Sequence, residues 1–226
     1  MKLTRSLFPF VFVTMVHLVG QFLEAPMVHD GTKPLLIPAL AFYFWKECIG
    51  SPLNKFVYAA LFFSWLGDCF LIFAPLKGIF FMLGLGSFLV AQIVYIIINI
   101  NFVNEGQSRL VFKWPALFFL LFGGGFFSFI IDDLGVLVLP VAVYCAVITL
   151  MGVTALGRYG RAEKQGAMLV ILGASLFIIS DAVIALNKFS SPVEWSGPIV
   201  MTTYLAAQFL LVKAYKEFIN GLKTSN

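Results

Sequence analysis

The chain has few charged residues and few of the side chains from which metal or disulfide sites are built. Asp, Glu, Lys and Arg make up 12% of its 226 residues, whereas 61% are hydrophobic. Soluble domains are about one quarter charged and about half apolar, so a soluble globular domain is excluded. Two histidines are too few for a multi-histidine centre, and the three cysteines lack paired or metal-type spacing. We therefore expect no metal, no cofactor and no disulfide framework.

Positive charge is also too scattered to indicate a nucleic-acid partner. The formal net charge is +4, but the basic residues stand singly in short loops and form no patch. Membrane topology explains them better, because Lys and Arg collect in cytoplasmic loops.

Long apolar runs fill most of the sequence. A membrane-spanning helix needs about 20 mostly apolar residues, and eight runs bounded by charges or turn residues are candidates. They are residues 7–23, 34–45, 56–75, 79–102, 114–131, 135–157, 166–187 and 197–215. The first run has the basic start of a signal peptide, but no small-x-small cleavage site follows, so we interpret it as a retained span. The sequence predicts an all-α polytopic membrane protein with eight transmembrane helices in one bundle.

Loop charges support this count. If all eight runs cross, one side holds all the basic residues except Lys33, Lys77 and Lys188. The strong asymmetry predicts that both termini are cytoplasmic. We expect the short second helix to extend backwards through Lys33, with the lysine reaching the outer interface.

The sequence indicates a single domain, residues 1–226, without a soluble insertion. Residues 62–68 weakly resemble residues 176–181, since each segment contains a serine and ends in an intramembrane aspartate. This internal similarity allows two parallel four-helix repeats, 1–113 and 114–226.

Asp68 and Asp181 are the two formal charges that lie well inside apolar runs. An aspartate near the bilayer centre costs about 2.5–3.5 kcal/mol on insertion scales, so both should face the bundle interior or a wet cavity. If the carboxyls meet in a low dielectric, one is expected to stay protonated, which creates a general acid beside a general base. The same pair suits proton relay in a transporter, and each acid could also simply lock helix packing.

Other polar side chains are candidates for binding a substrate in the same cavity. The set comprises His17, Lys33, Ser64, Gln92, Tyr95, Tyr204 and Gln208. Ser64 stands one helical turn before Asp68 and could donate to its carboxylate. Lys33 could attract a phosphate or pair with an aspartate. The alternative for the whole set is ordinary packing and hydrogen bonding between helices.

Six short motifs follow one another in a fixed order along the chain. They are Lys33-Pro34-Leu35, Ser64-x-x-Gly67-Asp68, residues 86–91 leading to Tyr95, residues 139–144, Ser180-Asp181-Ala182, and residues 202–208. The ordered set resembles the lysoplasmalogenase (YhhN-type) family of membrane proteins over nearly the whole chain. One position departs from the pattern, because this family usually shows histidine where the chain has Gln92. If that histidine carries a proton, activity here would be slow, altered or absent; if it only donates a hydrogen bond, glutamine suffices.

The resemblance implies an enzyme that hydrolyses the vinyl ether bond of lysoplasmalogens to a fatty aldehyde and a glycerophospho-head group. Its expected partners are a lysophospholipid with a vinyl ether chain and membrane lipids, in the endoplasmic reticulum of a eukaryote or the inner membrane of a bacterium. Vinyl ether hydrolysis proceeds by protonation of carbon and attack of water on an oxocarbenium ion, so Asp68 and Asp181 are the expected catalytic residues. A proton-coupled transporter and a non-catalytic lipid-binding protein are the alternatives.

Overall fold

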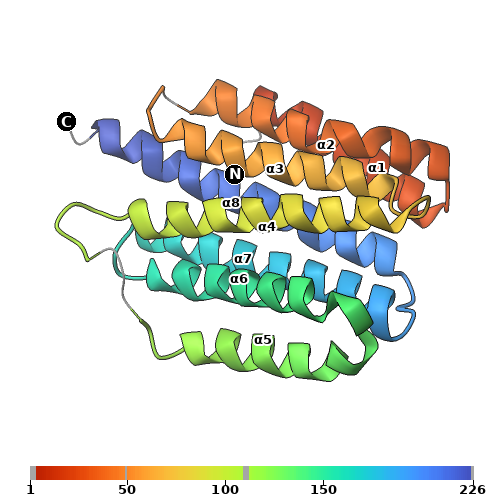
Figure 1. Ribbon diagram of the computed structural model, residues 1–226. Coiled ribbons are helices and arrows are strands. Elements are labelled where there is room, and N and C mark those ends of the chain that lie inside the picture. The colour runs from red at the N-terminus through yellow and green to blue at the C-terminus, as the bar shows by residue number, and fades with distance from the viewer. Residues whose placement is uncertain (1–3, 49, 109–111, 225–226) are drawn as a thin grey trace. The chain divides into compact units, whose positions relative to one another are not determined.

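The computed structural model describes residues 4–48, 50–108 and 112–224, and its regular structure is almost entirely helical (Figure 1). The α-helices are α1 (Phe8–Phe22), α2 (Pro26–Glu47), α3 (Asn54–Ile72), α4 (Gly78–Asn101), α5 (Ala116–Ile130), α6 (Val138–Gly157), α7 (Lys164–Ala185) and α8 (Ser196–Thr224). Short helical turns adjoin them at η1 (Arg5–Leu7), η2 (Ile131–Asp133), η3 (Gly135–Leu137) and η4 (Leu186–Ser190). The predicted all-α fold with eight helices is confirmed for this part of the chain.

Seven helical segments in the described ranges are long and apolar enough to cross a membrane. They are Arg5–Phe22, Asn54–Ile72, Gly78–Asn101, Ala116–Asp133, Gly135–Gly157, Lys164–Ser190 and Ser196–Leu222. Helix α2 has 22 residues and begins before Lys33, as predicted, but it is not among these segments. The chain is an integral multi-pass membrane protein. An eighth crossing by α2 and the cytoplasmic position of both termini stay predictions.

Two compact units divide the chain. Unit 1 contains the residues up to 94 and those from 219 onward, and unit 2 contains residues 95–218. Helices α4 and α8 each contribute to both units. The proposed four-helix repeat with its boundary at residue 113 stays a prediction.

Close helix packing in unit 1 depends on small residues. Gly20 of α1 lies against α2, since a Cβ atom there would stand 2.8 Å from a methyl group of Val28. Between α3 and α4, Gly67 accommodates the ring of Phe88 and Gly84 accommodates Leu71, with Cβ positions 2.6 and 2.9 Å from the facing side chains. Glycine at such positions lets membrane helices approach closely.

The two prolines inside α2 create a specific link to α3. Pro38 has no N–H, so the carbonyl of Pro34 lacks its normal helical donor. The indole Nε1 of Trp65 in α3 donates to that carbonyl at 2.9 Å. The broken helical hydrogen bond is thus replaced by a tertiary one, which anchors α2 beside α3.

Unit 2 uses the same kind of packing. Gly173 of α7 meets Leu211 of α8, and Gly152 of α6 meets the ring of Phe119 from α5. A buried cluster of Ile130, Leu134 and Val141 closes the end where α5 leads into α6.

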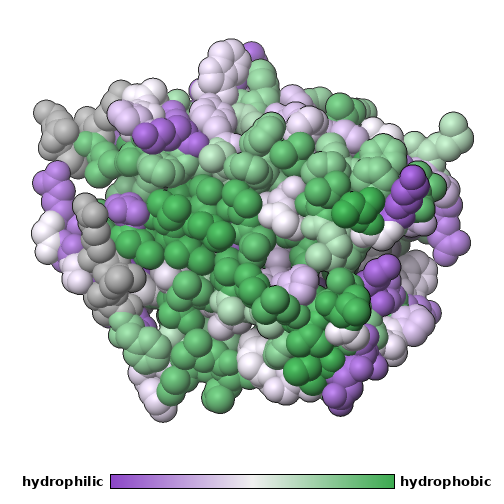
Figure 2. All heavy atoms as spheres, viewed as in Figure 1, coloured by the Kyte–Doolittle hydropathy of each residue, from purple (hydrophilic) through white to green (hydrophobic). Residues whose placement is uncertain are grey.

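Large apolar side chains also cover much of the outer surface. Figure 2 shows hydrophobic residues over most of the viewed face. Phe118 and Leu121 of α5 and Leu139 of α6 are 69%, 74% and 73% exposed. Apolar faces of this kind are what hydrocarbon-facing helices present to lipid.

Candidate functional site

The intramembrane carboxylate of unit 2 has a tyrosine partner. Tyr144 of α6 donates its hydroxyl to Oδ2 of Asp181 in the neighbouring helix α7, at 2.5 Å. Tyr144 is buried and Asp181 is partly buried. Distances of about 2.5–2.7 Å are typical of a hydroxyl bound to a charged carboxylate. The pair therefore combines a carboxylate with a second proton-bearing group inside an apolar helix pair.

The sequence alone assigns no role to Tyr144, although this residue lies in one of the family-like motifs, residues 139–144. The available signal was its hydroxyl within the apolar run 135–157, because a buried tyrosine hydroxyl usually needs a partner. The sequence alone does not say which helix supplies that partner.

The intramembrane carboxylate of unit 1 is more deeply enclosed. Asp68 is 2% exposed and Ser64, one turn earlier on α3, is fully buried. Gly67 lies beside Asp68 and receives the ring of Phe88 from α4. The charges of Asp68 and of the partly buried Lys33 both act on the thiol of Cys69, so Lys33 and Asp68 belong to the same region of unit 1.

Gln92 lies across from the helix turn that carries Ser64. The Gly67–Phe88 and Leu71–Gly84 contacts show that α3 and α4 pack antiparallel in one register. Moving four residues forward along α3, from Gly67 to Leu71, corresponds to moving four residues back along α4, from Phe88 to Gly84. Continuing that register by one turn places Gln92 opposite residues 63–64. Both amide atoms of Gln92 are buried and have no hydrogen-bond partner among the described residues. This amide is a ready polar contact for a ligand.

Three other predicted residues lie together in unit 2. The hydroxyl of Tyr95 donates to Oε1 of Gln208 at 2.6 Å, and both side chains are fully buried. The Tyr204 ring packs edge-on against Phe177, with ring centroids 5.5 Å apart. Phe177 in turn contacts the ring of Tyr95. The three residues, from α4 and α8, thus form one group with Phe177 of α7, through a hydrogen bond between Tyr95 and Gln208 and through ring contacts.

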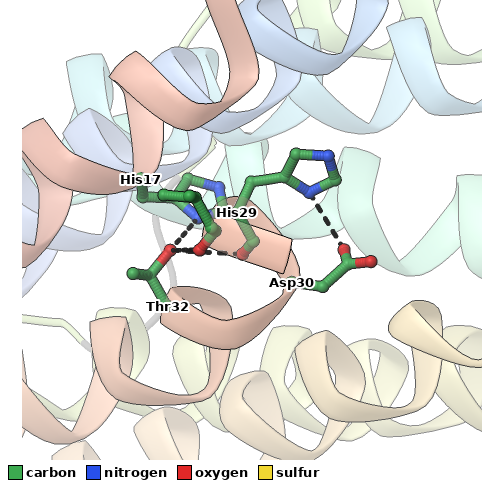
Figure 3. Close-up of polar contacts among 5 residues, drawn as sticks. His17, His29, Asp30 and Thr32 are labelled. Atoms are coloured by element: carbon green, nitrogen blue, oxygen red, sulfur yellow. Dashed lines mark hydrogen bonds and ion pairs between the residues drawn. The ribbon is translucent and has the colours of Figure 1, made fainter. Parts of the chain in front are cut away.

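His17 is held at the turn between α1 and α2 (Figure 3). Its Nδ1 lies 3.0 Å from the hydroxyl of Thr32, and that hydroxyl donates to the carbonyl of Val28 at 2.7 Å. If the single proton of the hydroxyl goes to the Val28 carbonyl, the imidazole donates from Nδ1 and Nε2 is left as an acceptor. The neighbouring His29 pairs with Asp30 at 2.9 Å. His17 is therefore fixed through Nδ1, with a buried Nε2 that has no partner in the described part of the chain.

The structure describes residues 4–48, 50–108 and 112–224. Within these ranges, no three His, Cys, Asp or Glu side chains gather so that they could hold a metal ion.

Fold and site define a class: a helical multi-pass membrane protein with one aspartate buried in α3 and another bound to tyrosine in α7. Residues 28–215 match the model of the YhhN family. The chain belongs to the YhhN family.

Three curated relatives are named lysoplasmalogenases. The chain is 32% identical over 165 residues to "Lysoplasmalogenase TMEM86A" of Bos taurus, and 33% identical over 174 residues to the Homo sapiens protein of that name. It is 28% identical over 181 residues to "Lysoplasmalogenase TMEM86B" of Homo sapiens. The matches cover 71%, 71% and 79% of this chain, and 65%, 65% and 71% of the relatives. The chain thus spans slightly less than two thirds of both TMEM86A proteins. No solved structure matches it.

Proposed function

We propose that this protein hydrolyses the vinyl ether bond of lysoplasmalogens and releases a fatty aldehyde and a glycerophospho-head group. Membership of the YhhN family and the printed names of its relatives support this reaction. The observation on which the proposal depends most is the Tyr144–Asp181 hydrogen bond. It supplies a carboxylate and a hydroxyl inside a helix pair whose surroundings suit a lipid chain.

The reaction needs one proton donor and one base. A proton adds to the alkenyl carbon that is not bonded to oxygen, and the adjacent carbon and the ether oxygen then share the positive charge of an oxocarbenium ion. Water attacks the carbon of that ion and loses a proton to the base, giving a hemiacetal. The hemiacetal breaks its bond to the glycerol oxygen and yields aldehyde and alcohol, with water as the only co-reactant.

The surroundings of the two aspartates suit different roles. Asp181 accepts a hydrogen bond from Tyr144, and a donor of this kind favours the charged form of a carboxyl group, so we assign to it the stabilisation of the oxocarbenium ion and the activation of water. Asp68, enclosed in α3 at 2% exposure, is assigned the proton donation to carbon. Each assignment is tested separately by the corresponding asparagine variant.

Two side chains of unit 1 are assigned to the substrate's polar end. Lys33 shares the region of Asp68 and supplies a positive charge for the phosphate. Gln92 supplies an unpaired amide for a glycerol hydroxyl. These contacts would distinguish a lysophospholipid from a plain vinyl ether.

The proposal is tested with the purified full chain in an uncharged detergent. Fatty aldehyde release is measured from a lysoplasmalogen, and fatty acid release is measured from the matched control, the ester-linked lysophospholipid with the same head group. We expect turnover of the vinyl ether alone. Reaction in D2O should place one deuterium on the aldehyde carbon next to the carbonyl, because a proton adds there; the free aldehyde incubated alone controls for exchange.

Absence of aldehyde release would refute the reaction and favour a transporter or a lipid-binding protein. Release without carbon-bound deuterium above the exchange control would refute protonation of carbon. In Asp68→Asn we expect a rate decrease of about 10²-fold or more, the usual scale for loss of a general acid. An unchanged rate in Asp68→Asn would remove this residue from the mechanism.

A further inference from the structure

Unit 2 buries an arginine where α6 ends. Arg158 directly follows the membrane-length segment Gly135–Gly157 and is 1% exposed, and Arg161 in the same turn is 4% exposed. Arginine is almost never fully buried unless it is paired. The partners of these two side chains therefore decide what the turn can do.

Most of the Arg158 guanidinium has no acceptor. Nε and Nη1 are buried and have no hydrogen-bond partner in residues 4–48, 50–108 and 112–224. The ionisable groups that act on it are Tyr215 and Arg161, and neither is a carboxylate. Burial lowers the pKa of Arg158 to about 10, which still leaves it positively charged at neutral pH. The turn thus holds a buried cation without a counter-charge.

Aromatic rings hold this guanidinium in place. Its central carbon lies 5.7 Å from the ring centroid of Tyr215 and 5.3 Å from that of Phe218. The hydroxyl of Tyr215 is engaged elsewhere, since it donates to Oδ1 of Asn99 at 2.9 Å. Cation–π contacts position a guanidinium but do not use up its N–H donors. The two rings therefore orient the guanidinium of Arg158, and its Nε and Nη1 donors are left unbonded by these contacts.

Arg161 brings a second positive charge and is fixed by the backbone. Its Nε donates to the carbonyl of Gly157, and its Nη1 donates to the carbonyl of Ser108 at 2.5 Å. The carbonyl of Arg161 accepts from the N–H of Asn104 at 2.8 Å. The segment after α4 thus holds the turn in shape beside Arg158.

We propose that Arg158, with Arg161 beside it, binds a phosphate group, either that of a lipid head group or a free phosphate. The planar fork of arginine donors matches phosphate oxygens better than it matches a spherical anion. The position at the end of a membrane-length helix is the depth at which lipid phosphates lie.

This site is separate from the carboxylate in α7. Asp181 lies near the far end of α7, about 25 Å along the helix from Lys164 at 1.5 Å per residue. The phosphate of a lysophospholipid is only a few bonds from its ether oxygen, so one substrate molecule cannot place its phosphate at Arg158 and its ether at Asp181. The inference therefore does not depend on the proposed reaction.

The test measures the thermal unfolding midpoint of the full chain in an uncharged detergent and phosphate-free buffer. One arm adds inorganic phosphate, a second adds phosphatidate, and a third adds sodium chloride at matched ionic strength. We expect a saturable rise of the midpoint with phosphatidate or phosphate and none with chloride. A rise with phosphatidate alone identifies the lipid head group, and a rise in both arms identifies phosphate itself.

Two variants make the test specific. Arg158→Lys keeps the charge but loses the fork, and should raise the half-saturating concentration by about tenfold or more. Lys164→Gln removes one exposed positive charge near the same turn and should leave that concentration unchanged. The proposal is overturned if the wild type shows no saturable rise, if Arg158→Lys binds as the wild type does, or if Lys164→Gln weakens binding equally. Where a variant is poorly folded, the absence of a saturable rise in the wild type still overturns the proposal.

Discussion

Unit 2 contains two charged side chains of opposite sign with very different surroundings. Asp181 accepts a short hydrogen bond from Tyr144, whereas Nε and Nη1 of Arg158 have no acceptor in the described part of the chain. The fold supplies a donor for the carboxylate, whereas the described residues around the guanidinium include two aromatic rings and a second arginine. Buried polar groups are normally paired, so the unpaired donors of Arg158 indicate a site for a ligand. The paired carboxyl of Asp181 instead indicates a group positioned for catalysis.

The largest expected effect comes from removing the carboxylate. Asp181→Asn keeps the size of the side chain but removes its charge, and we expect aldehyde release to fall by about 10²- to 10⁴-fold. The control is Asp132→Asn, the same change at an exposed aspartate of η2. Steady-state rates of both variants on a lysoplasmalogen measure the effect. Equal losses in the two variants would contradict a catalytic role for Asp181.

The next effect comes from removing the donor. Tyr144→Phe deletes one hydroxyl and leaves Asp181 without that bond, which for a charged acceptor is worth about 1.5–3 kcal/mol. If this stabilisation acts in the transition state, the rate falls by about ten- to a hundredfold. Tyr159→Phe, at an exposed tyrosine in the α6–α7 turn, is the matched control. A wild-type rate in Tyr144→Phe would show that the pair is structural.

Removing the unpaired charge of Arg158 should not destabilise the protein in phosphate-free buffer. Arg158→Met replaces a buried cation by an apolar side chain of similar length, so unfolding should become no easier, and up to about 2 kcal/mol harder. The same variant should lose the phosphate-dependent rise of the midpoint. Chemical denaturation with and without phosphate separates the two results. A destabilisation without phosphate would mean that the chain itself satisfies Arg158.

The smallest expected effect concerns the unpaired amide of unit 1. Gln92→Leu removes two buried polar atoms that have no partner among the described residues, so the unfolding free energy should change by less than about 1 kcal/mol. Gln208→Leu is the paired counterpart, since it deprives the buried hydroxyl of Tyr95 of its acceptor and should cost about 1–3 kcal/mol. Thermal unfolding compares the two. Similar losses would contradict the distinction between paired and unpaired groups.

The match between sequence and structure is best where a long, mostly apolar run contains no charged residue. The run 79–102 became α4 at Gly78–Asn101, because a mostly apolar stretch of membrane length has no other stable conformation in lipid. The match is poorer for α2, whose apolar run was placed at 34–45 with an extension back through Lys33, and which spans Pro26–Glu47. Pro34 and Pro38 argue against a helix locally, yet the indole of Trp65 satisfies one of the carbonyls they leave free. That compensation comes from another helix and is invisible in a local pattern.

The candidate site also contains some residues that the sequence singles out and others whose role only the structure shows. Composition and hydropathy singled out Asp68 and Asp181, because a carboxylate in an apolar run is costly and therefore conspicuous in the sequence. Tyr144 went unassigned, and Arg158 was counted only as a loop charge. Nothing in either local segment says that one hydroxyl reaches Asp181 or that one guanidinium is buried without an acceptor.

The sequence by itself determined the class of fold, the positions of the long apolar helices and the two intramembrane acids. These follow from the cost of exposing backbone and charge to hydrocarbon, which depends on each residue and its near neighbours. Only the tertiary structure decided the partner of each buried polar group. Those partnerships depend on how each helix is rotated and how closely it packs, and these are set jointly by both surfaces of a contact.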